Sequence, residues 1–271
     1  MNIAVTDLTF TYPSGVQALR GVTLTLLSGE AVAIVGENGA GKTTLVKQFN
    51  GLLRPTSGSV TVGEWDTRSV SVAKLASRVG YVFQNPDDQL FERSVIKEAS
   101  FGPKNLGRSE EASASAAAEA LAMVGLEAEV NAHPYDLHLS QRKLLALAAV
   151  LAMHTPLIVL DEPTTGQDAR GLARIGAIIR ALKAERRTVI TITHDIDFAA
   201  EHFERVIVMA RGQVLAEGPA PDVLSRTDVL AEAEVEPPQM ARLAHALGYS
   251  GTPLAPGDFV DMVERRTNET T

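Results

Sequence analysis

The sequence predicts an α/β fold: a parallel sheet at the core, an antiparallel β subdomain at the N-terminus, an inserted α-helical subdomain and a small helical C-terminal extension. Three observations support this prediction. The first third of the chain is rich in short β patterns, residues 95–153 follow a helical pattern, and strand and helix patterns alternate after that. Such alternation is typical of a parallel sheet covered by helices.

The N-terminal third consists of short β-rich runs separated by turn residues. We expect strands over residues 3–10, 18–27 and 31–35, because each run is rich in β-branched and apolar residues. The sequence PSG at residues 13–15 marks a turn between the first two. This part therefore predicts the antiparallel β subdomain and the first strand of the core.

The middle of the chain becomes helical. An Ala-rich segment, residues 113–123, begins just after Glu110 and Glu111, and acidic side chains are favourable at the positive end of a helix. Further patterns are an apolar strand over 157–160, a helix over 171–184, a strand over 188–193, a hairpin of 206–209 and 214–217, and a helical tail from about 226. Helices are thus inserted before the strands resume.

Composition narrows the classes of function. The 271 residues suffice for one core and a smaller appendage. A net charge of −8 argues against a broad nucleic-acid footprint, which needs a surplus of Lys and Arg, so no nucleic-acid partner is expected. The chain has no Cys, and its first residues lack a basic segment followed by a long apolar run. We therefore expect a cytosolic chain.

The strongest chemical signal is GENGAGKTT, residues 36–44, which fits the pattern G-x-x-x-x-G-K-[ST] between an apolar strand and a helical run. Glycines let successive backbone N–H groups turn toward a phosphate, and the helix N-terminus adds a positive end. Lys42 is expected to pair with the β- and γ-phosphates, and Thr43 to bind Mg²⁺. The nucleotide-binding residues predicted from this segment are Gly36, Asn38, Gly39, Ala40, Gly41, Lys42, Thr43 and Thr44.

Two acidic residues follow the apolar strand of LIVLDEP. Asp161 can hold Mg²⁺ through water, and Glu162 can polarise the attacking water. His194, in TITHD, follows another apolar strand. Because parallel strands bring their C-terminal ends to one edge of a sheet, we expect His194 and Glu162 to converge on the γ-phosphate. With Lys42, they are the predicted catalytic residues.

These residues together resemble the ATPase subunits of ATP-binding cassette (ABC) transporters, over about residues 2–225. The resemblance implies a RecA-like P-loop NTPase core that binds ATP and Mg²⁺. It also implies that Tyr12 in FTYPSG stacks on adenine, that Gln84 in YVFQNP senses Mg²⁺ and couples to the membrane partner, and that Asp168 in TTGQD makes a contact across a dimer. Considered alone, Tyr12 is better interpreted as an edge aromatic and Gln84 as a loop amide, but the order and context of the motifs favour the nucleotide roles.

Within this family, FQNPDDQLF, EPTTGQD and ASFGPKNLG resemble the ATPase subunits of energy-coupling factor (ECF) importers. The resemblance implies a peripheral protein at the cytoplasmic face of the membrane. Its partners would be a second ATPase, an integral membrane coupling protein and a small membrane protein that captures vitamins or transition-metal ions. The ATPase domain would span residues 1–225, with the helical subdomain inserted at about 86–153, and residues 226–271 would form the extension.

The tail sequence EPPQMARLAHALG resembles the helical extension that helps two such ATPases stay together, although a solvated helical cap is an alternative. Two other functions remain open: a soluble cassette protein outside transport, and a subunit that mainly binds nucleotide. A soluble cassette would normally show two cassettes or a long coiled-coil insertion, which this sequence lacks. The intact Lys42, Asp161, Glu162 and His194 argue against mere nucleotide binding at this chain's own phosphate loop.

The segment LHLSQ, residues 137–141, departs from the LSGGQ pattern of the family. We call it the signature segment. In the family this loop of one subunit grips the γ-phosphate held by the other, through a serine hydroxyl and glycine amides. Here His138 stands at the serine position, and Leu139 and Ser140 stand at the two glycines. The sequence therefore predicts a heterodimer with two unequal sites, and a helix that begins near Gln141.

Overall fold

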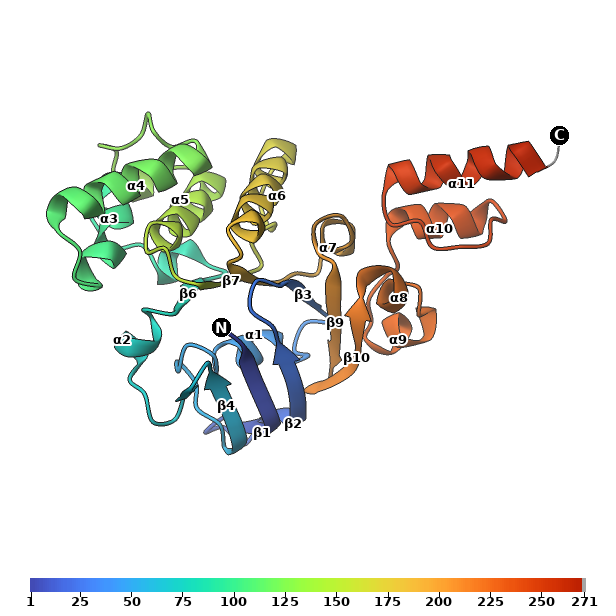
Figure 1. The fold of residues 1–271 in the computed structure, drawn as a ribbon, viewed down its shortest axis with the longest axis horizontal. Helices are drawn as coiled ribbons and strands as arrows, with labels where there is room; N and C mark the ends of the chain where they lie inside the picture. The colour runs from blue at the N-terminus through green and yellow to red at the C-terminus, as the bar shows by residue number, and fades with distance from the viewer. Residues whose placement is uncertain (270–271) are drawn as a thin grey trace.

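The computed structural model describes residues 1–269 and contains two sheets (Figure 1). The larger sheet has six strands in the order β10-β9-β3-β8-β7-β6, and all neighbouring pairs are parallel except β9 with β10. The smaller sheet has the order β2-β1-β4-β5 and is antiparallel. The predicted α/β fold with an N-terminal antiparallel subdomain is confirmed.

The strands are short and mostly lie where the β patterns are. Their bounds are β1 Ile3–Thr11, β2 Gln17–Leu26, β3 Ala31–Val35, β4 Ser57–Val62, β5 Trp65–Asp66, β6 Val79–Val82, β7 Leu157–Asp161, β8 Thr188–Ile192, β9 Arg205–Ala210 and β10 Gln213–Pro219.

The helices form the inserted subdomain, the cover of the large sheet and the tail. Their bounds are α1 Lys42–Val46, α2 Val72–Leu75, η1 Pro86–Asp88, α3 Val95–Asn105, α4 Glu110–Val124, η2 Pro134–Asp136, α5 Leu139–Leu151, α6 Ala169–Ala184, α7 Ile196–His202, α8 Ala220–Leu224, α9 Thr227–Glu232, α10 Gln239–Ala246 and α11 Pro256–Glu269.

The large sheet separates two hydrophobic cores. On β3, side chains alternate between the faces, so Ala31, Ala33 and Val35 pack with the helical layer, whereas Val32 and Ile34 pack with α1 and the antiparallel sheet. All five are buried, which explains why this strand reads as a continuous apolar run. Packing on both faces holds the sheet in place. The predicted catalytic residues follow the C-terminal ends of its parallel strands.

Several local predictions can be compared directly with the elements. The strand over 31–35 and the closing hairpin are present, and α4 carries Glu110 and Glu111 in its first turn as expected. The helix predicted to begin near Gln141 begins at Leu139, within the signature segment, and the N–H of His138 donates to Oε1 of Gln141 in its first turn.

Between β10 and residue 269, the chain forms the helices α8 to α11. Helices α8 and α9 pack near β9, whereas α10 and α11 lie side by side and project away from the sheets (Figure 1). Within residues 1–269, no helix is long and apolar enough to cross a membrane.

Candidate active site

Residues 36–44, the phosphate loop, connect β3 to α1. Two of its glycines are required by geometry. A Cβ on Gly36 would lie 2.0 Å from the carbonyl oxygen of Met209, and one on Gly41 would lie 2.6 Å from that of Ala18. Both glycines also have positive φ, 150° and 99°. The loop therefore adopts a tight backbone path that larger residues would block.

Lys42 begins α1, and its side chain folds back over the loop. Its Nζ donates to the carbonyl oxygens of Gly36 at 2.7 Å and Glu37 at 2.8 Å. Burial lowers the pKa of Lys42, and the carboxylates of Glu162 and Asp161 oppose that shift. The ammonium is thus held at the mouth of the loop, where it can exchange these carbonyls for phosphate oxygens.

Asp161 ends β7 and is held by two hydroxyl groups. Oγ1 of Thr43 donates to its Oδ1 at 3.1 Å, and the phenol of Tyr81 donates to its Oδ2 at 2.7 Å. Burial and the nearby Asp161 charge raise the pKa of Tyr81, so the phenol keeps its proton and acts as a donor. The structure thereby brings together Asp161 and Thr43, two of the residues predicted to hold a metal.

The ends of β7 and β8 also bring Glu162 and His194 together, as their positions after parallel strands predicted. Nδ1 of His194 lies 2.7 Å from Oε2 of Glu162. The backbone of Glu162 has a φ of 51°, in the left-handed region, and its N–H donates to the carbonyl of Ile192 at 2.9 Å. The Glu162 side chain is buried, whereas the imidazole of His194 is 61% exposed.

A cavity of about 560 Å³ lies over the phosphate loop, and Tyr12, Gln84 and Glu162 are among the residues that line it. The phenol of Tyr12 lies 2.9 Å from Oγ1 of Thr44, and its ring meets that of Phe10 edge to face at 4.8 Å. Gln84 is exposed to this cavity. All of the predicted nucleotide-binding residues except Gly36 therefore line one concave surface.

Other predicted residues lie at the ends of helices. Oδ1 of Asp168 accepts from the N–H of Gly171 at 2.8 Å, so this carboxylate caps α6 while remaining exposed. In the signature segment, Leu139 is 48% exposed, and the carbonyl of Ser140 accepts from Nε2 of Gln167 at 3.2 Å. The signature segment thus lies on the surface at the start of α5.

Sequence reasoning missed three contributors to the site. Tyr81 belongs to none of the sequence motifs, and it lies beside Asp161 only because β6 pairs with β7. Lys143 reads as part of an amphipathic helix, but its Nζ donates to the carbonyl of Glu162 at 3.1 Å. The tail also reaches the phosphate loop, because the N–H of Glu37 donates to the carbonyl of Ala233 at 3.1 Å.

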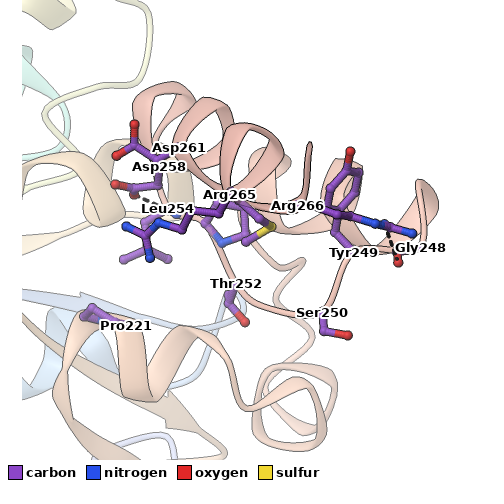
Figure 2. Close-up of a pocket in the computed structure, with 12 residues that line it drawn as sticks. Pro221, Gly248, Tyr249, Ser250, Thr252, Leu254, Asp258, Asp261, Arg265 and Arg266 are labelled. Atoms are coloured by element: carbon purple, nitrogen blue, oxygen red, sulfur yellow. Dashed lines mark hydrogen bonds between the residues drawn. The ribbon is translucent and has the colours of Figure 1, made fainter. Parts of the chain in front are cut away.

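Another cavity, of about 830 Å³, lies between α8 and α11 (Figure 2). Oδ2 of Asp258 accepts from the N–H groups of Leu254 and Ala255, and the guanidinium of Arg266 stacks over the ring of Tyr249 at 4.6 Å. None of the residues predicted to bind nucleotide lines this cavity. This cavity is therefore separate from the predicted nucleotide site.

The residues around Thr43 and Asp161 suit Mg²⁺. The donors are a hydroxyl and a carboxylate, with the Gln84 amide in the same cavity as Thr43. Among residues 1–269, no group of three His, Cys, Asp or Glu residues forms a ready-made metal cage. Mg²⁺ usually binds through one or two carboxylates together with substrate phosphates and water, so these residues fit it without such a cage.

Comparison with known proteins agrees with this geometry. A family model described as ABC transporter matches residues 19–165. The energy-coupling factor transporter ATP-binding protein EcfA of Methanocaldococcus jannaschii is 40% identical over 245 residues, 89% of this chain and 87% of that protein. The structure of cbiO1 from Clostridium perfringens, described as part of the ABC transporter complex cbiONQ, has a TM-score of 0.75 and 33% identity, and the match covers 90% of this chain and 98% of that one.

Some relatives are longer. A putative ABC transporter ATP-binding protein of Methanosarcina acetivorans is 42% identical over 243 residues, 90% of this chain, but this chain spans only 40% of its length. The family model covers more than half of this chain, and the EcfA relative matches almost end to end. The chain belongs to the ABC transporter family of ATP-hydrolysing, ATP-binding cassettes.

Proposed function

We propose that this chain is an ATP-hydrolysing subunit of an ECF-type ABC importer, which drives uptake of a vitamin or transition-metal ion through membrane partners. The observation that carries the proposal is the shared edge of the large sheet, where Lys42, Asp161, Glu162 and His194 converge. The 40% identity to an EcfA protein supports the ECF class. Localisation at the cytoplasmic face of the membrane, as a peripheral subunit, follows from this proposal.

The phosphate loop and its neighbours bind the nucleotide. Lys42 pairs with the β- and γ-phosphates, and the N–H groups of residues 36–44 surround them. Tyr12, which also lines the cavity, offers its ring to adenine. Thr43, Asp161 and Gln84 hold Mg²⁺, which when bound neutralises charge on the phosphate oxygens.

Glu162 acts as the general base for the attacking water. Its carboxylate is oriented by the contact with Nδ1 of His194, and Lys42 lies close enough for its charge to interact with it. His194 contacts the γ-phosphate from its exposed side. Glu162 needs only to take a proton from the water, because phosphoryl transfer depends mainly on positioning and charge stabilisation.

A membrane coupling protein docks on a groove of about 270 Å³ between the core and the helical subdomain. The groove is mainly apolar, and its rim carries Phe91 and Phe101, which are 60% and 40% exposed with ring centroids 4.7 Å apart. Exposed apolar surface of this kind is typical of an interaction site. Gln89 and Phe91 line this groove, and they follow Gln84, the residue predicted to couple to that partner.

A second ATPase of different sequence completes the unit, with Asp168 at the contact between the two. The altered signature segment supports a heterodimer, because a homodimer would place His138 and Ser140 at both sites. This segment completes the nucleotide site on the partner's phosphate loop. Because the segment is altered, we expect that site mainly to bind ATP and to hydrolyse it slowly. No nucleic acid takes part.

Purification of a tagged full-length chain from membranes tests the proposal. We expect an integral membrane protein and a second ATPase to copurify, and ATP turnover by this complex to disappear in the Lys42→Ala variant. A chain that purifies alone, and whose turnover is unaffected by membrane extracts, would indicate a soluble cassette protein outside transport. Turnover that survives Lys42→Ala would contradict the nucleotide site.

A further inference from the structure

Glu162 is held at three points, two on its backbone and one on its side chain. Its φ of 51° is uncommon for a residue with a side chain, so the local conformation depends on its surroundings. The N–H is bound to the carbonyl of Ile192, the carboxylate contacts His194, and the carbonyl accepts from Nζ of Lys143 at 3.1 Å. The third contact comes from a different part of the fold, the inserted helical subdomain.

Lys143 occupies a position in α5 that would otherwise suit an apolar residue. The whole residue is only 9% exposed, and its neighbours Leu144 and Leu145 are buried. Burying an ammonium is unfavourable unless it is paired. Burial lowers the pKa of Lys143, and the charges of Glu162 and Asp161 oppose that shift.

The charges around the base are balanced. Lys143 and Lys42 supply two buried cations, and Asp161 and Glu162 supply two buried carboxylates. A lysine that served only to fill space in α5 would gain nothing from this arrangement. Its contact with the Glu162 carbonyl therefore indicates a role at the site.

The same helix begins with the signature segment. A second hydrogen bond, from Nε2 of Gln167 to the carbonyl of Ser140, joins the first turn of α5 to the turn that follows Glu162. The start of α5 is thus tied twice to residues 162–167. A displacement of α5 would be passed to Glu162 through Lys143.

We propose that Lys143 is a positioning residue that fixes the Glu162 carboxylate through its backbone carbonyl, and that it makes hydrolysis at this chain's own phosphate loop depend on the placement of α5. The inference rests on the proposed function in one respect, the assignment of Glu162 as the base. It adds a link within one chain between the general base and the segment that faces the partner's nucleotide.

The test compares steady-state ATP turnover and nucleotide affinity of the complex that copurifies with the tagged chain. Lys143→Met removes the charge and the donor at similar volume, and we expect kcat to fall about tenfold to a hundredfold, the typical effect of a slightly misplaced catalytic group. The dissociation constant for a fluorescent ATP analogue should stay within about twofold, because this contact does not touch the phosphate loop. Lys143→Arg, which keeps a cation with comparable reach, should recover part of the turnover.

Two further variants make the result specific. Lys104→Met, the same change at a half-exposed lysine paired with Glu110 in the helical subdomain, should leave kcat unchanged. In a Glu162→Gln background, Lys143→Met should cause no further fall in single-turnover hydrolysis, since both changes act through one group. If Lys143→Met does not fold, Lys143→Gln, which is polar but too short to reach the carbonyl, takes its place with the same expected fall.

The outcomes separate the two proposals. If Glu162→Gln keeps normal turnover, the assigned base and hence the proposed mechanism are wrong. If Glu162→Gln is inactive while Lys143→Met or Lys143→Gln keeps normal kcat, only the role of Lys143 is wrong. A fall in nucleotide affinity as large as the fall in kcat, or an additive loss in the Glu162→Gln background, would show a merely structural role.

Discussion

Nδ1 of His194 lies 2.7 Å from Oε2 of Glu162, although the two residues are 32 positions apart in the sequence. They follow the neighbouring parallel strands β8 and β7, so the sheet itself brings them together. Glu162 is buried and His194 is mostly exposed, so one member of the pair is shielded from solvent and the other can reach a ligand. This arrangement suits Glu162 as a general base, with His194 available to contact a ligand.

The first prediction separates phosphate binding from water activation. Lys42→Ala should weaken ATP binding strongly, because it removes the buried cation at the loop mouth. Glu162→Gln should retain ATP binding, trap a closed dimer and lower turnover by about a hundredfold to ten-thousandfold, the usual contribution of a general base. Equilibrium nucleotide binding, size-exclusion chromatography and phosphate release check these outcomes. Unchanged turnover by Glu162→Gln would rule out Glu162 as the base.

The second prediction concerns Tyr81, whose phenol donates to Oδ2 of Asp161. Tyr81→Phe keeps the ring but leaves the Asp161 carboxylate with only one of its two hydroxyl contacts, the one from Thr43. Loss of such an outer contact typically costs about tenfold to a hundredfold in metal affinity. Mg²⁺ titrations of ATP binding should therefore shift to higher concentration, while binding of ATP without Mg²⁺ stays the same. Identical titrations for the variant and the parent would show that Thr43 alone orients Asp161.

The pairs Glu162–His194 and Tyr81–Asp161 illustrate what the sequence can and cannot predict. The strand Ala31–Val35, the phosphate loop and the approach of His194 to Glu162 follow from local pattern and from the rule that parallel strands end at one edge. Tyr81 and Lys143 could not be found in this way, because their contacts depend on how β6 and α5 pack against β7. The sequence signals are weak: Tyr81 is a polar residue within an apolar run, and Lys143 directly precedes one.

The tail shows a second limit. The periodicity of the tail predicts its helices, but it does not predict two of its hydrogen bonds. In these, the N–H of Glu37 donates to the carbonyl of Ala233, and the N–H of Gln239 donates to Oδ1 of Asp197. Backbone groups carry no residue-specific pattern, so such contacts are invisible to sequence reasoning. The division at residue 225 remains a prediction, and these contacts join the extension to the phosphate loop and to α7.

The third prediction uses His202, which is 6% exposed, packs edge to face on Phe198, and lies near Arg180 and Glu201. Burial lowers the pKa of His202 below its usual 6.5. The unfolded chain then binds more protons than the folded chain, so the free energy of unfolding should fall as pH drops from about 6.5 toward the lowered pKa, and level off above 6.5.

Thermal unfolding at pH 5.5 and 7.5 checks this effect. His202→Phe, which keeps an aromatic ring but cannot titrate, should lose less Tm on acidification than the parent. Each 1 kcal/mol corresponds to about 2–4 °C for a chain of this size. His245→Gln, at an exposed histidine of α10, should behave like the parent. An equal loss of Tm in His202→Phe and the parent would assign the pH dependence to other groups.

The fourth prediction refines the role of residues 84–91. Asp88 and Phe91 are exposed and should contact the membrane partner, so Asp88→Ala with Phe91→Ala should reduce uptake while basal ATP turnover remains. Gln89 is different, because its amide donates to the carbonyl of Ala146 and accepts from the N–H of Phe83. Gln89→Ala should therefore also lower thermal stability. Normal uptake by the Asp88 and Phe91 double variant would place the partner elsewhere.

The last prediction concerns the signature segment. His138 and Leu139 are exposed at the start of α5, so the segment is presented to a partner, but its hydroxyl has moved from the expected position to Ser140. The helix still offers its positive N-terminus, so the contact with the partner's γ-phosphate should be weakened and not abolished. Losing one donor to developing charge costs about 3 kcal/mol, or roughly a hundredfold in rate. The chain alone should thus hydrolyse ATP slowly.

Restoring the segment gives the decisive comparison. His138→Ser combined with Leu139→Gly and Ser140→Gly should raise turnover by the chain alone, because paired copies would then supply the hydroxyl and the close backbone approach. The parent chain should reach brisk turnover only with a second ATPase that carries an intact segment, acting on the nucleotide held by Lys42. Brisk turnover by the unmodified chain alone, unchanged by the triple substitution, would show that LHLSQ is fully competent and that the two sites are equal.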